Sequence, residues 1–361
     1  MSSTSLSCST AAFALGIALV GGVYMSVVYP ELPPTKLKRG EAKLVVLSDV
    51  ISSSERQKIT QAFGDEFPSG KFLLGRHGTT HFHVHGTNLE KLIVLAHGLG
   101  TNSHIYDAMI APLVDAGYAV LTYDYFGHGW SVAEDRFLTY DKQVVLDQLE
   151  DLLDHVLPGS ETPVFGIVGH STGGCVGILA DHYLARSVDR LFFISPAFFA
   201  DKPLIAQLAD MVPSFVHGIL RRNLLHNVMS DAYLENGEVS WAKGMNGDYL
   251  FSSEREVSVE KNKKMFAHHP FIIGGIFGLN AYILRTDLLP FYRTLLSSTK
   301  ARTMIAWGVL DVVVPYNEAN VAAVSVNSKV TVLGMEGLGH ESPMEDPQAV
   351  SKVMIDFFQS L

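Results

Sequence analysis

Short apolar runs alternate with amphipathic segments along much of the chain, and this alternation constrains the fold more than any other feature. The apolar runs include KLIVLA, AVLTY and VFGIV, and each is followed by a segment with helical spacing of its apolar residues, such as SHIYDAMIAPLVDAGY. Strands that alternate with helices form βαβ units, which place parallel strands in one sheet and helices on both of its faces. The sequence therefore predicts an α/β fold with a mostly parallel central sheet.

The alternation stops after Ala197 and resumes near Arg285. Residues 198–285 have a helical character, are rich in Leu, Met and Phe, and end close to the apolar run FIIGGIFGLNAYIL. That run is too short to cross a bilayer, so we expect it to pack over the domain or to face an apolar ligand. An excursion between two strands of one sheet predicts a helical lid at 198–285, inserted between core segments at 71–197 and 286–361.

The N-terminal region predicts a membrane anchor. Ala11–Tyr29 contains 19 uncharged, mostly apolar residues, about the length of a transmembrane helix. We therefore assign an anchor to residues 1–30 and a linker with a lead-in segment to 31–70. A cleaved signal peptide is the alternative, although MSSTSLSCST lacks the usual basic residues. The basic residues of KLKRG follow the apolar run and favour a catalytic domain that faces the cytoplasm.

Charge and cysteine usage exclude several classes of partner. The formal net charge of −10 repels a phosphate backbone, so nucleic acid is not expected as a partner. The chain has two cysteines, Cys8 and Cys175, which indicate neither a disulfide framework nor a thiolate metal site. Cys175 lies within a predicted helix, where we expect it to be a small buried apolar residue.

The segment HFHVH places three histidines on one face of a predicted strand, at positions 81, 83 and 85. Three imidazoles in such a row could hold zinc. No carboxylate or open-site pattern accompanies them, and an early strand of this kind of sheet usually lies at an edge. We therefore expect solvent-facing histidines, and we predict no metal and no cofactor.

The stretch VFGIVGHSTGG places Ser171 between a predicted strand and a predicted helix. Gly169 and Gly173 stand two positions before and after it, as in the pattern G-x-S-x-G. Glycines at these positions allow a tight, strained turn from which the hydroxyl projects beyond the edge of the sheet. A serine hydroxyl becomes a good nucleophile only when a neighbouring base takes its proton.

From about Phe72 to Leu361 the chain resembles the α/β-hydrolase superfamily, and the resemblance begins with G-x-S-x-G in this context. In that family the nucleophile is followed along the chain by an acid and then by a base, each after a strand. Asp311 in WGVLDVVVP and His340 in GLGHESPMEDP match this order with Ser171. The resemblance thus implies a Ser171, Asp311 and His340 triad, with Asp201 and Asp287 as alternative acids.

The resemblance also implies an oxyanion hole, a pair of backbone amides that stabilise the negative oxygen of the intermediate. The matching positions are Leu99, in a loop HGLG similar to the family's HGxG loop, and Thr172. We expect His97, Gly98 and His170, which adjoin these amides, to contact the substrate. A further segment, DYFGHGWS, is similar to the D-x-x-G-x-G-x-S stretch of lid-bearing members. We interpret it as support for the pocket, and its histidine as structural rather than substrate-binding.

These motifs resemble the monoglyceride-lipase and serine-aminopeptidase-like branch, although Thr172 stands where that branch commonly has Met. The resemblance implies a serine hydrolase that cleaves carboxylic esters through an acyl-enzyme. The predicted anchor, the apolar lid and the few charges near the motifs favour a membrane-anchored enzyme with lipid-like substrates, such as monoacylglycerols or lysophospholipids. Its partners would be that small-molecule ester and the membrane. A serine at the nucleophile position argues against dehalogenase and epoxide-hydrolase chemistry. An aminopeptidase or amidase of the same fold and a non-catalytic binding protein remain alternatives.

Overall fold

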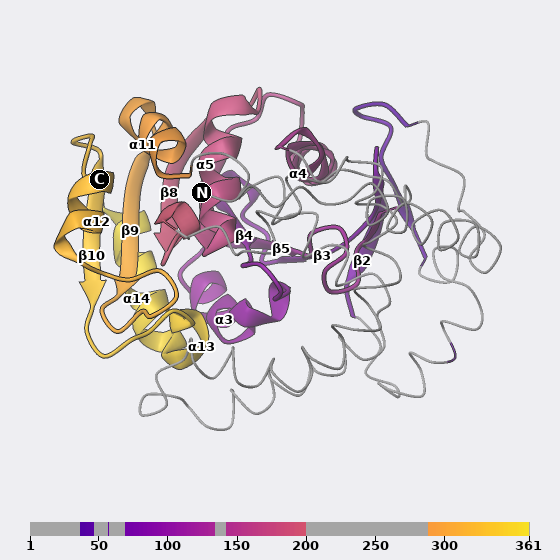
Figure 1. The fold of residues 1–361 in the computed structure, drawn as a ribbon. Coiled ribbons are helices and arrows are strands. Elements are labelled where there is room, and N and C mark those ends of the chain that lie inside the picture. The colour runs from indigo at the N-terminus through magenta and orange to yellow at the C-terminus, as the bar shows by residue number, and fades with distance from the viewer. Residues whose placement is uncertain (1–36, 47–56, 58–68, 134–141, 200–287, 361) are drawn as a thin grey trace, which may run out of the picture.

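A ten-stranded sheet organises the part of the chain that the computed structural model describes, which is residues 37–46, 57, 69–133, 142–199 and 288–360 (Figure 1). Six neighbouring strands run parallel, in the order β5 (Ala119–Tyr123), β4 (Leu92–Ala96), β7 (Val164–His170), β8 (Val188–Ile194), β9 (Arg302–Gly308) and β10 (Val330–Met335). The antiparallel strands are β1 (Lys43–Val45), β2 (Lys71–Leu74), β3 (Gly78–His85) and the short β6 (Val132–Ala133), which pairs with β3. The predicted mostly parallel sheet is confirmed.

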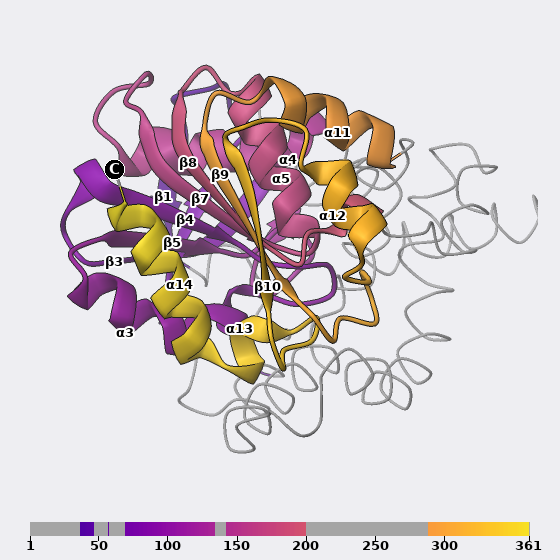
Figure 2. The same cartoon turned by 90° about the vertical axis from the view of Figure 1, so that its left-hand side faces the viewer.

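Helices cover both faces of the sheet, as predicted (Figure 2). One face carries α3 (Asp107–Asp115), the short α13 (Ser342–Glu345) and α14 (Pro347–Gln359). The other carries α4 (Lys142–Val156), α5 (Thr172–Tyr183), α11 (Leu288–Ser298) and α12 (Glu318–Val324). Three short 3-10 turns complete the described elements, η2 (Leu89–Lys91), η3 (Ser103–Tyr106) and η4 (Ala197–Phe199).

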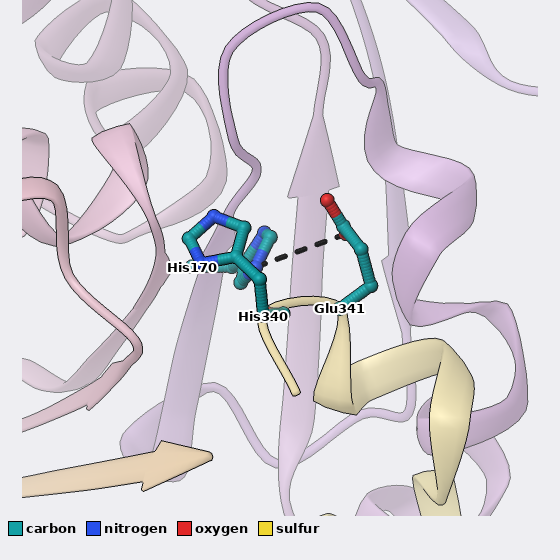
Figure 3. A group of neighbouring side chains, drawn as sticks. All are labelled: His170, His340 and Glu341. Atoms are coloured by element: carbon teal, nitrogen blue, oxygen red, sulfur yellow. Dashed lines mark hydrogen bonds and ion pairs between the residues drawn. The ribbon is translucent and has the colours of Figure 1, made fainter. Parts of the chain in front are cut away.

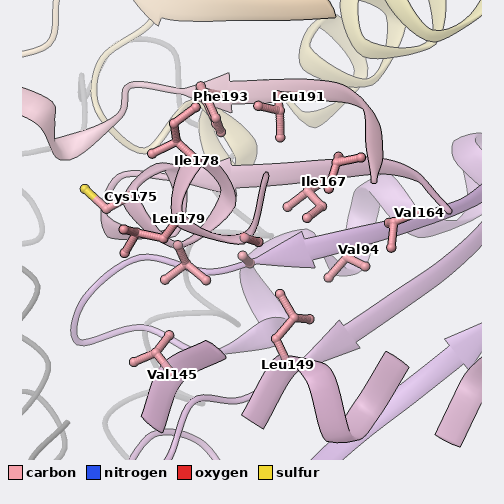
Figure 4. Packing of buried hydrophobic residues seen from close by; sticks show 14 of the residues in the cluster. Val94, Val145, Leu149, Val164, Ile167, Cys175, Ile178, Leu179, Leu191 and Phe193 are labelled. Carbon is pink, nitrogen blue, oxygen red and sulfur yellow. The ribbon is translucent and has the colours of Figure 1, made fainter. Parts of the chain in front are cut away.

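Strand β4 shows how the sequence pattern builds two cores. Alternate residues of a strand point to opposite faces, and Val94 belongs to the core beneath α4 and α5 while its neighbour Ile93 belongs to the core beneath α3 and α14. Figure 4 shows the first of these cores, to which Val94 of β4 and Leu149 of α4 both belong. Both faces of β4 are fully buried, which is why its sequence is continuously apolar instead of alternating with polar residues.

Strand β3 corrects the expectation for the histidines of HFHVH. It lies between β2 and β5, not at the sheet edge, because β1 and β2 extend the sheet beyond it. His81 is consequently buried, so the solvent-facing prediction is wrong for this residue. His83 and His85 are half-buried, and burial, aided by the neighbouring imidazoles, lowers the pKa of His83 to about 4.

An ion-pair cluster fastens helix α4 to the turn between β2 and β3. The Arg76 guanidinium donates to Asp151 at 2.8 Å, and to Asp147 and Glu150 at 2.9 Å each. The Arg76 side chain is only 15% exposed, so its ion pairs are largely shielded from solvent, and Glu150 also pairs with Arg39 at 2.9 Å. Burial raises the pKa of the Asp151 carboxyl even in contact with this cation.

The chain leaves the sheet after β8 and returns through α11, and these two points are in contact. Phe198 of η4 stacks on Tyr292 of α11, with ring centroids 5.1 Å apart and planes inclined by 24°. The predicted lid lies outside the described residues apart from its first two positions, and so do Asp201 and Asp287.

The predicted anchor over Ala11–Tyr29 also lies outside the described residues. Within the described ranges, no helix combines the length and the apolar character needed to span a membrane.

Candidate active site

Ser171 occupies a sharp turn between the end of β7 and the start of α5. Its backbone has φ 51° and ψ −117°, a conformation that costs free energy in a residue other than glycine. The turn is held because the Ser171 amide donates to the carbonyl of Ile194 at 2.9 Å, and the Ser171 carbonyl accepts from Ala197 at 3.0 Å. The strained backbone conformation is therefore that of the predicted nucleophile, as expected for a turn that projects a hydroxyl from a sheet edge.

The glycines of G-x-S-x-G are required by space. A Cβ at Gly169 would overlap the carbonyl of Gly173, and a Cβ at Gly173 would overlap the carbonyl of Ala96 at the end of β4. Neither glycine has a positive φ, so conformational freedom is not what selects it. The motif allows α5 to start directly against two neighbouring strands, which holds Ser171 at their carboxyl ends.

Asp311 follows β9 and His340 follows β10, and the two side chains are in contact. Nδ1 of His340 donates to Oδ2 of Asp311 at 2.8 Å, while Oδ1 of Asp311 accepts from the backbone amides of Val313 and Val314, also at 2.8 Å each. The carboxylate is thereby fixed on both sides, and it requires the proton of a neutral His340 to be on Nδ1. Nε2 of His340 is then the nitrogen that can accept a proton.

Ser171 Oγ makes no hydrogen bond to any residue in the described part of the chain. The structure thus brings Asp311 and His340 together and places Ser171 at the carboxyl end of a nearby strand, without a formed serine–histidine hydrogen bond. Catalytic hydrogen bonds are often unformed when no substrate is bound.

The loop that carries His340 is held by Glu345 of α13. This fully buried carboxylate accepts from the backbone amide of Gly339 at 2.6 Å and from that of Glu341 at 3.1 Å, the residues on either side of His340. Burial alone would lower the pKa of His340, but the hydrogen bond to Asp311 and the charges of Asp311, Glu341 and Glu345 outweigh burial and raise it. Residue 345 was not predicted from the sequence.

The HGLG loop after β4 packs against the Ser171 turn. A Cβ added to Gly98 would lie 3.0 Å from Nδ1 of His170 and 3.3 Å from Cβ of Ser171, so only glycine fits there without displacement. Leu99, the next residue, is half-buried, and Thr172 is the first residue of α5, where a backbone amide has no partner within the helix. The predicted oxyanion-hole residues thus lie on two segments that contact each other.

The histidines of these loops support the backbone. Nδ1 of His97 donates to the Gly98 carbonyl at 2.7 Å and Nε2 accepts from the Tyr125 amide at 3.1 Å, so neither ring nitrogen of His97 is available to a substrate. Burial lowers the pKa of His97 to about 4, which keeps it neutral. His128 is buried and its Nε2 accepts from the Gly100 amide at 3.3 Å, which agrees with the predicted structural role.

Asp124 of DYFGHGWS fixes the neighbouring loops. Its buried carboxylate accepts from the backbone amides of Ser103 at 2.9 Å and Trp130 at 3.0 Å, and from Nδ1 of His81 at 2.8 Å. Burial alone would raise the pKa of Asp124, but the His81 hydrogen bond and charge, together with the backbone donors, hold this pKa well below its usual range. Gly129 is required because a Cβ there would overlap the carboxylate. Asp124 is therefore the residue through which this segment supports the neighbouring loops.

This chain is similar to known hydrolases in sequence and in fold. The alpha/beta hydrolase family model matches residues 93–353, more than half of the chain. The monoglyceride lipase of Rattus norvegicus is 32% identical over 161 residues, which are 41% of this chain and 52% of the relative. The monoglyceride lipase homolog of monkeypox virus is 30% identical over 189 residues, which are 49% of this chain and 60% of that protein.

Among solved structures, an esterase from Exiguobacterium antarcticum superposes with a TM-score of 0.62 over 81% of this chain and 100% of its own, at 17% identity. Likeness at this identity shows the fold alone. The chain spans about half the length of the monoglyceride lipases that it matches. The parallel sheet, the strained serine turn and the family match over most of the core together show that this chain belongs to the alpha/beta hydrolase family and resembles its monoglyceride lipase branch.

Proposed function

We propose that this protein hydrolyses carboxylic esters through an acyl-enzyme, with Ser171 as nucleophile, His340 as general base and Asp311 as the carboxylate that orients the base. The observation that carries the proposal is the 2.8 Å contact between Nδ1 of His340 and Oδ2 of Asp311, at the sheet edge where Ser171 occupies its strained turn. Such a pair leaves Nε2 of His340 to accept the serine proton.

In the proposed reaction, Ser171 Oγ attacks the ester carbonyl carbon while its proton passes to Nε2 of His340. This step requires the Ser171 side chain to turn toward His340. The carbonyl oxygen becomes negative and accepts hydrogen bonds from the backbone amides of Leu99 and Thr172. The alcohol leaves with the proton of His340, and water, activated by the same imidazole, releases the acid and restores Ser171.

For the substrate we propose a lipid-like ester, a monoacylglycerol or a lysophospholipid. Support comes from the likeness to the rat monoglyceride lipase, from the apolar character of the predicted lid at 198–285, and from the predicted anchor over Ala11–Tyr29. We further propose that this anchor spans the membrane once and leaves the catalytic domain on the cytoplasmic side. Retention of the full chain in membranes after alkaline extraction, and its loss when residues 1–30 are deleted, would test the anchor.

Labelling with a fluorophosphonate probe tests the catalytic assignment. We expect the wild-type protein to be labelled, Ser171→Ala to be unlabelled, and Ser325→Ala, which changes an exposed serine at the end of α12, to be labelled like the wild type. Asp311→Asn should lower kcat by about 10⁴-fold on p-nitrophenyl acetate because the base loses its tautomer. Labelling that persists in Ser171→Ala would refute the nucleophile, and no labelling of the wild type would indicate a non-catalytic binding protein.

A substrate panel of p-nitrophenyl esters, monoacylglycerols and aminoacyl amides tests the substrate class. We expect kcat/KM to be highest for monoacylglycerols and lowest for aminoacyl amides. Faster turnover of the amides would instead favour the aminopeptidase or amidase alternative.

A further inference from the structure

His170, His340 and Glu341 form a buried cluster beside the Ser171 turn. One ring nitrogen of each histidine and one carboxylate oxygen of Glu341 lie within 4.8 Å of one another. His170 comes from the end of β7, whereas His340 and Glu341 come from the loop after β10. Figure 3 shows the Glu341 carboxylate directed toward the His170 ring, with the His340 ring alongside. The topology thus gathers two imidazoles and one carboxylate at a single point.

Two polar atoms of this cluster have no hydrogen-bond partner among the described residues. They are Nδ1 of His170 and Oε2 of Glu341, and both are buried. Oε2 of Glu341 lies 3.8 Å from Nε2 of His170, which is too long for a hydrogen bond. Buried polar atoms are almost always partnered in folded proteins, so the unpartnered Oε2 of Glu341, which faces Nε2 of His170, points to a ligand between them.

We propose that His170, His340 and Glu341 form a binding site for a divalent transition-metal ion, with zinc as the ion that their chemistry fits best. Two imidazole nitrogens and one carboxylate oxygen are the donors that zinc takes in sites with three protein ligands and one open position. Asp311, bonded to Nδ1 of His340, supplies the outer carboxylate that commonly orients a metal-bound imidazole. Nε2 of His340 is the nitrogen left for the metal.

The cluster must contract to hold zinc, which requires Glu341 to move and His170 to exchange one hydrogen bond for the metal. Zinc bonds of about 2.0–2.1 Å place tetrahedral ligand atoms roughly 3.3 Å apart, which is closer than the cluster now stands. Glu341 can turn its Oε2 inward without giving up a hydrogen bond. His170 donates through Nε2 to the His340 carbonyl at 2.9 Å, so metal binding at Nε2 replaces this hydrogen bond and leaves the imidazole proton on Nδ1. The neutral imidazole keeps one proton throughout.

Occupancy of this site would block the proposed reaction. The metal would take the lone pair on Nε2 of His340, which is the same lone pair that accepts the Ser171 proton. Zinc would therefore act as a reversible inhibitor. The binding site stands on the geometry of the cluster alone, whereas inhibition rests on the proposed function.

Zinc binding to the variant Ser171→Ala tests the metal site separately from the inhibition. Zinc chloride is titrated calorimetrically into Ser171→Ala, alone and combined with Glu341→Gln or Glu336→Gln. Glu336 is the matched control because it is an exposed glutamate of the same loop. We expect Glu341→Gln to weaken the tightest zinc site by about 100-fold, as loss of a ligand should exceed the effect of losing an outer partner, and Glu336→Gln to leave it unchanged.

Zinc binding to histidines elsewhere, including His83 and His85, contributes the same background heat in both variants. Glu341→Asp keeps the charge with a shorter reach and should give an intermediate affinity, which guards against a folding defect in Glu341→Gln. Equal zinc affinity in the Glu341→Gln and Glu336→Gln proteins, or no binding up to millimolar zinc, would overturn the proposal.

Inhibition is measured as the rate of fluorophosphonate labelling in the protein with Ser171 intact. Zinc should slow the labelling of the wild type and of Glu336→Gln equally and should affect Glu341→Gln at about 100-fold higher concentration. If zinc binds as expected but the metal-free wild type is never labelled, the proposed function fails while the metal site stands. If the wild type is labelled and zinc at concentrations that saturate the calorimetric site does not slow the labelling, His340 is not a ligand and the proposed site fails while the function stands.

Discussion

Glu345→Gln should impair the protein through the position of His340. The carboxylate of Glu345 accepts from the amides of Gly339 and Glu341, so one side chain fixes the backbone on both sides of the proposed base. Glutamine has nearly the same shape but only one acceptor oxygen. Its amide group must therefore present N–H hydrogens to one of the two backbone N–H donors, which leaves a buried donor without a partner.

The size of the effect follows from these two bonds. A hydrogen bond to a charged group contributes about 1.5–3 kcal/mol, and a neutral one about 1 kcal/mol. Glu345→Gln exchanges two charge-assisted bonds for one neutral bond, so we expect the free energy of unfolding to fall by about 2–5 kcal/mol. Because the residues beside His340 are released, kcat should fall more than KM rises.

Urea denaturation and steady-state hydrolysis of p-nitrophenyl acetate measure these two effects. The matched control is Asp346→Asn, the same acid-to-amide change at the next residue. Asp346 accepts from Ala349 at the start of α14, and asparagine is an equally good residue at that helix cap, so we expect a change below about 0.5 kcal/mol. The reasoning is refuted if both variants unfold at the same urea concentration and hydrolyse the ester at the same rate.

Two further predictions concern stability. Arg76→Ala should lower the free energy of unfolding by about 3 kcal/mol or more, since it removes the cation shared by three largely buried carboxylates of α4, of which Glu150 keeps a second arginine, Arg39. Lys352→Ala, which removes an exposed pair on α14, should cost less than about 1 kcal/mol in the same urea experiment. Asp124 keeps its charge in the folded state while the unfolded chain takes up a proton below about pH 4. Wild-type stability should therefore fall with decreasing pH there, and Asp124→Asn should remove about 1.4 kcal/mol per pH unit from that slope; an unchanged slope would contradict the assignment of a depressed pKa to Asp124.

The parts of the fold that follow from local pattern could be predicted from the sequence. Continuously apolar runs such as that of β4 mark strands buried on both faces, and their alternation with helices fixes a parallel sheet. Because the carboxyl ends of parallel strands share one edge, Ser171 after β7, Asp311 after β9 and His340 after β10 could be assigned to a common region.

Features that depend on tertiary partners could not be predicted. The pairing of β1 and β2 beyond β3 depends on contacts between segments that no local sequence pattern reveals. This pairing places HFHVH in an interior strand of the sheet instead of an edge strand. Glu345 lies in GLGHESPMEDP, where no pattern distinguishes it from the other acids. Its role exists because the short helix α13 turns its carboxylate back onto the loop.

The stack of Phe198 on Tyr292 closes the base of the excursion between β8 and α11. The free energy required to close a loop grows only slowly with its length once the two ends are held together. The contact between Phe198 and Tyr292 therefore keeps the free energy of closing this connection nearly independent of the number of residues in it. The two ends of the connection are thus held by a contact of their own, so the sheet and its serine turn could be kept while the number of residues between them changes.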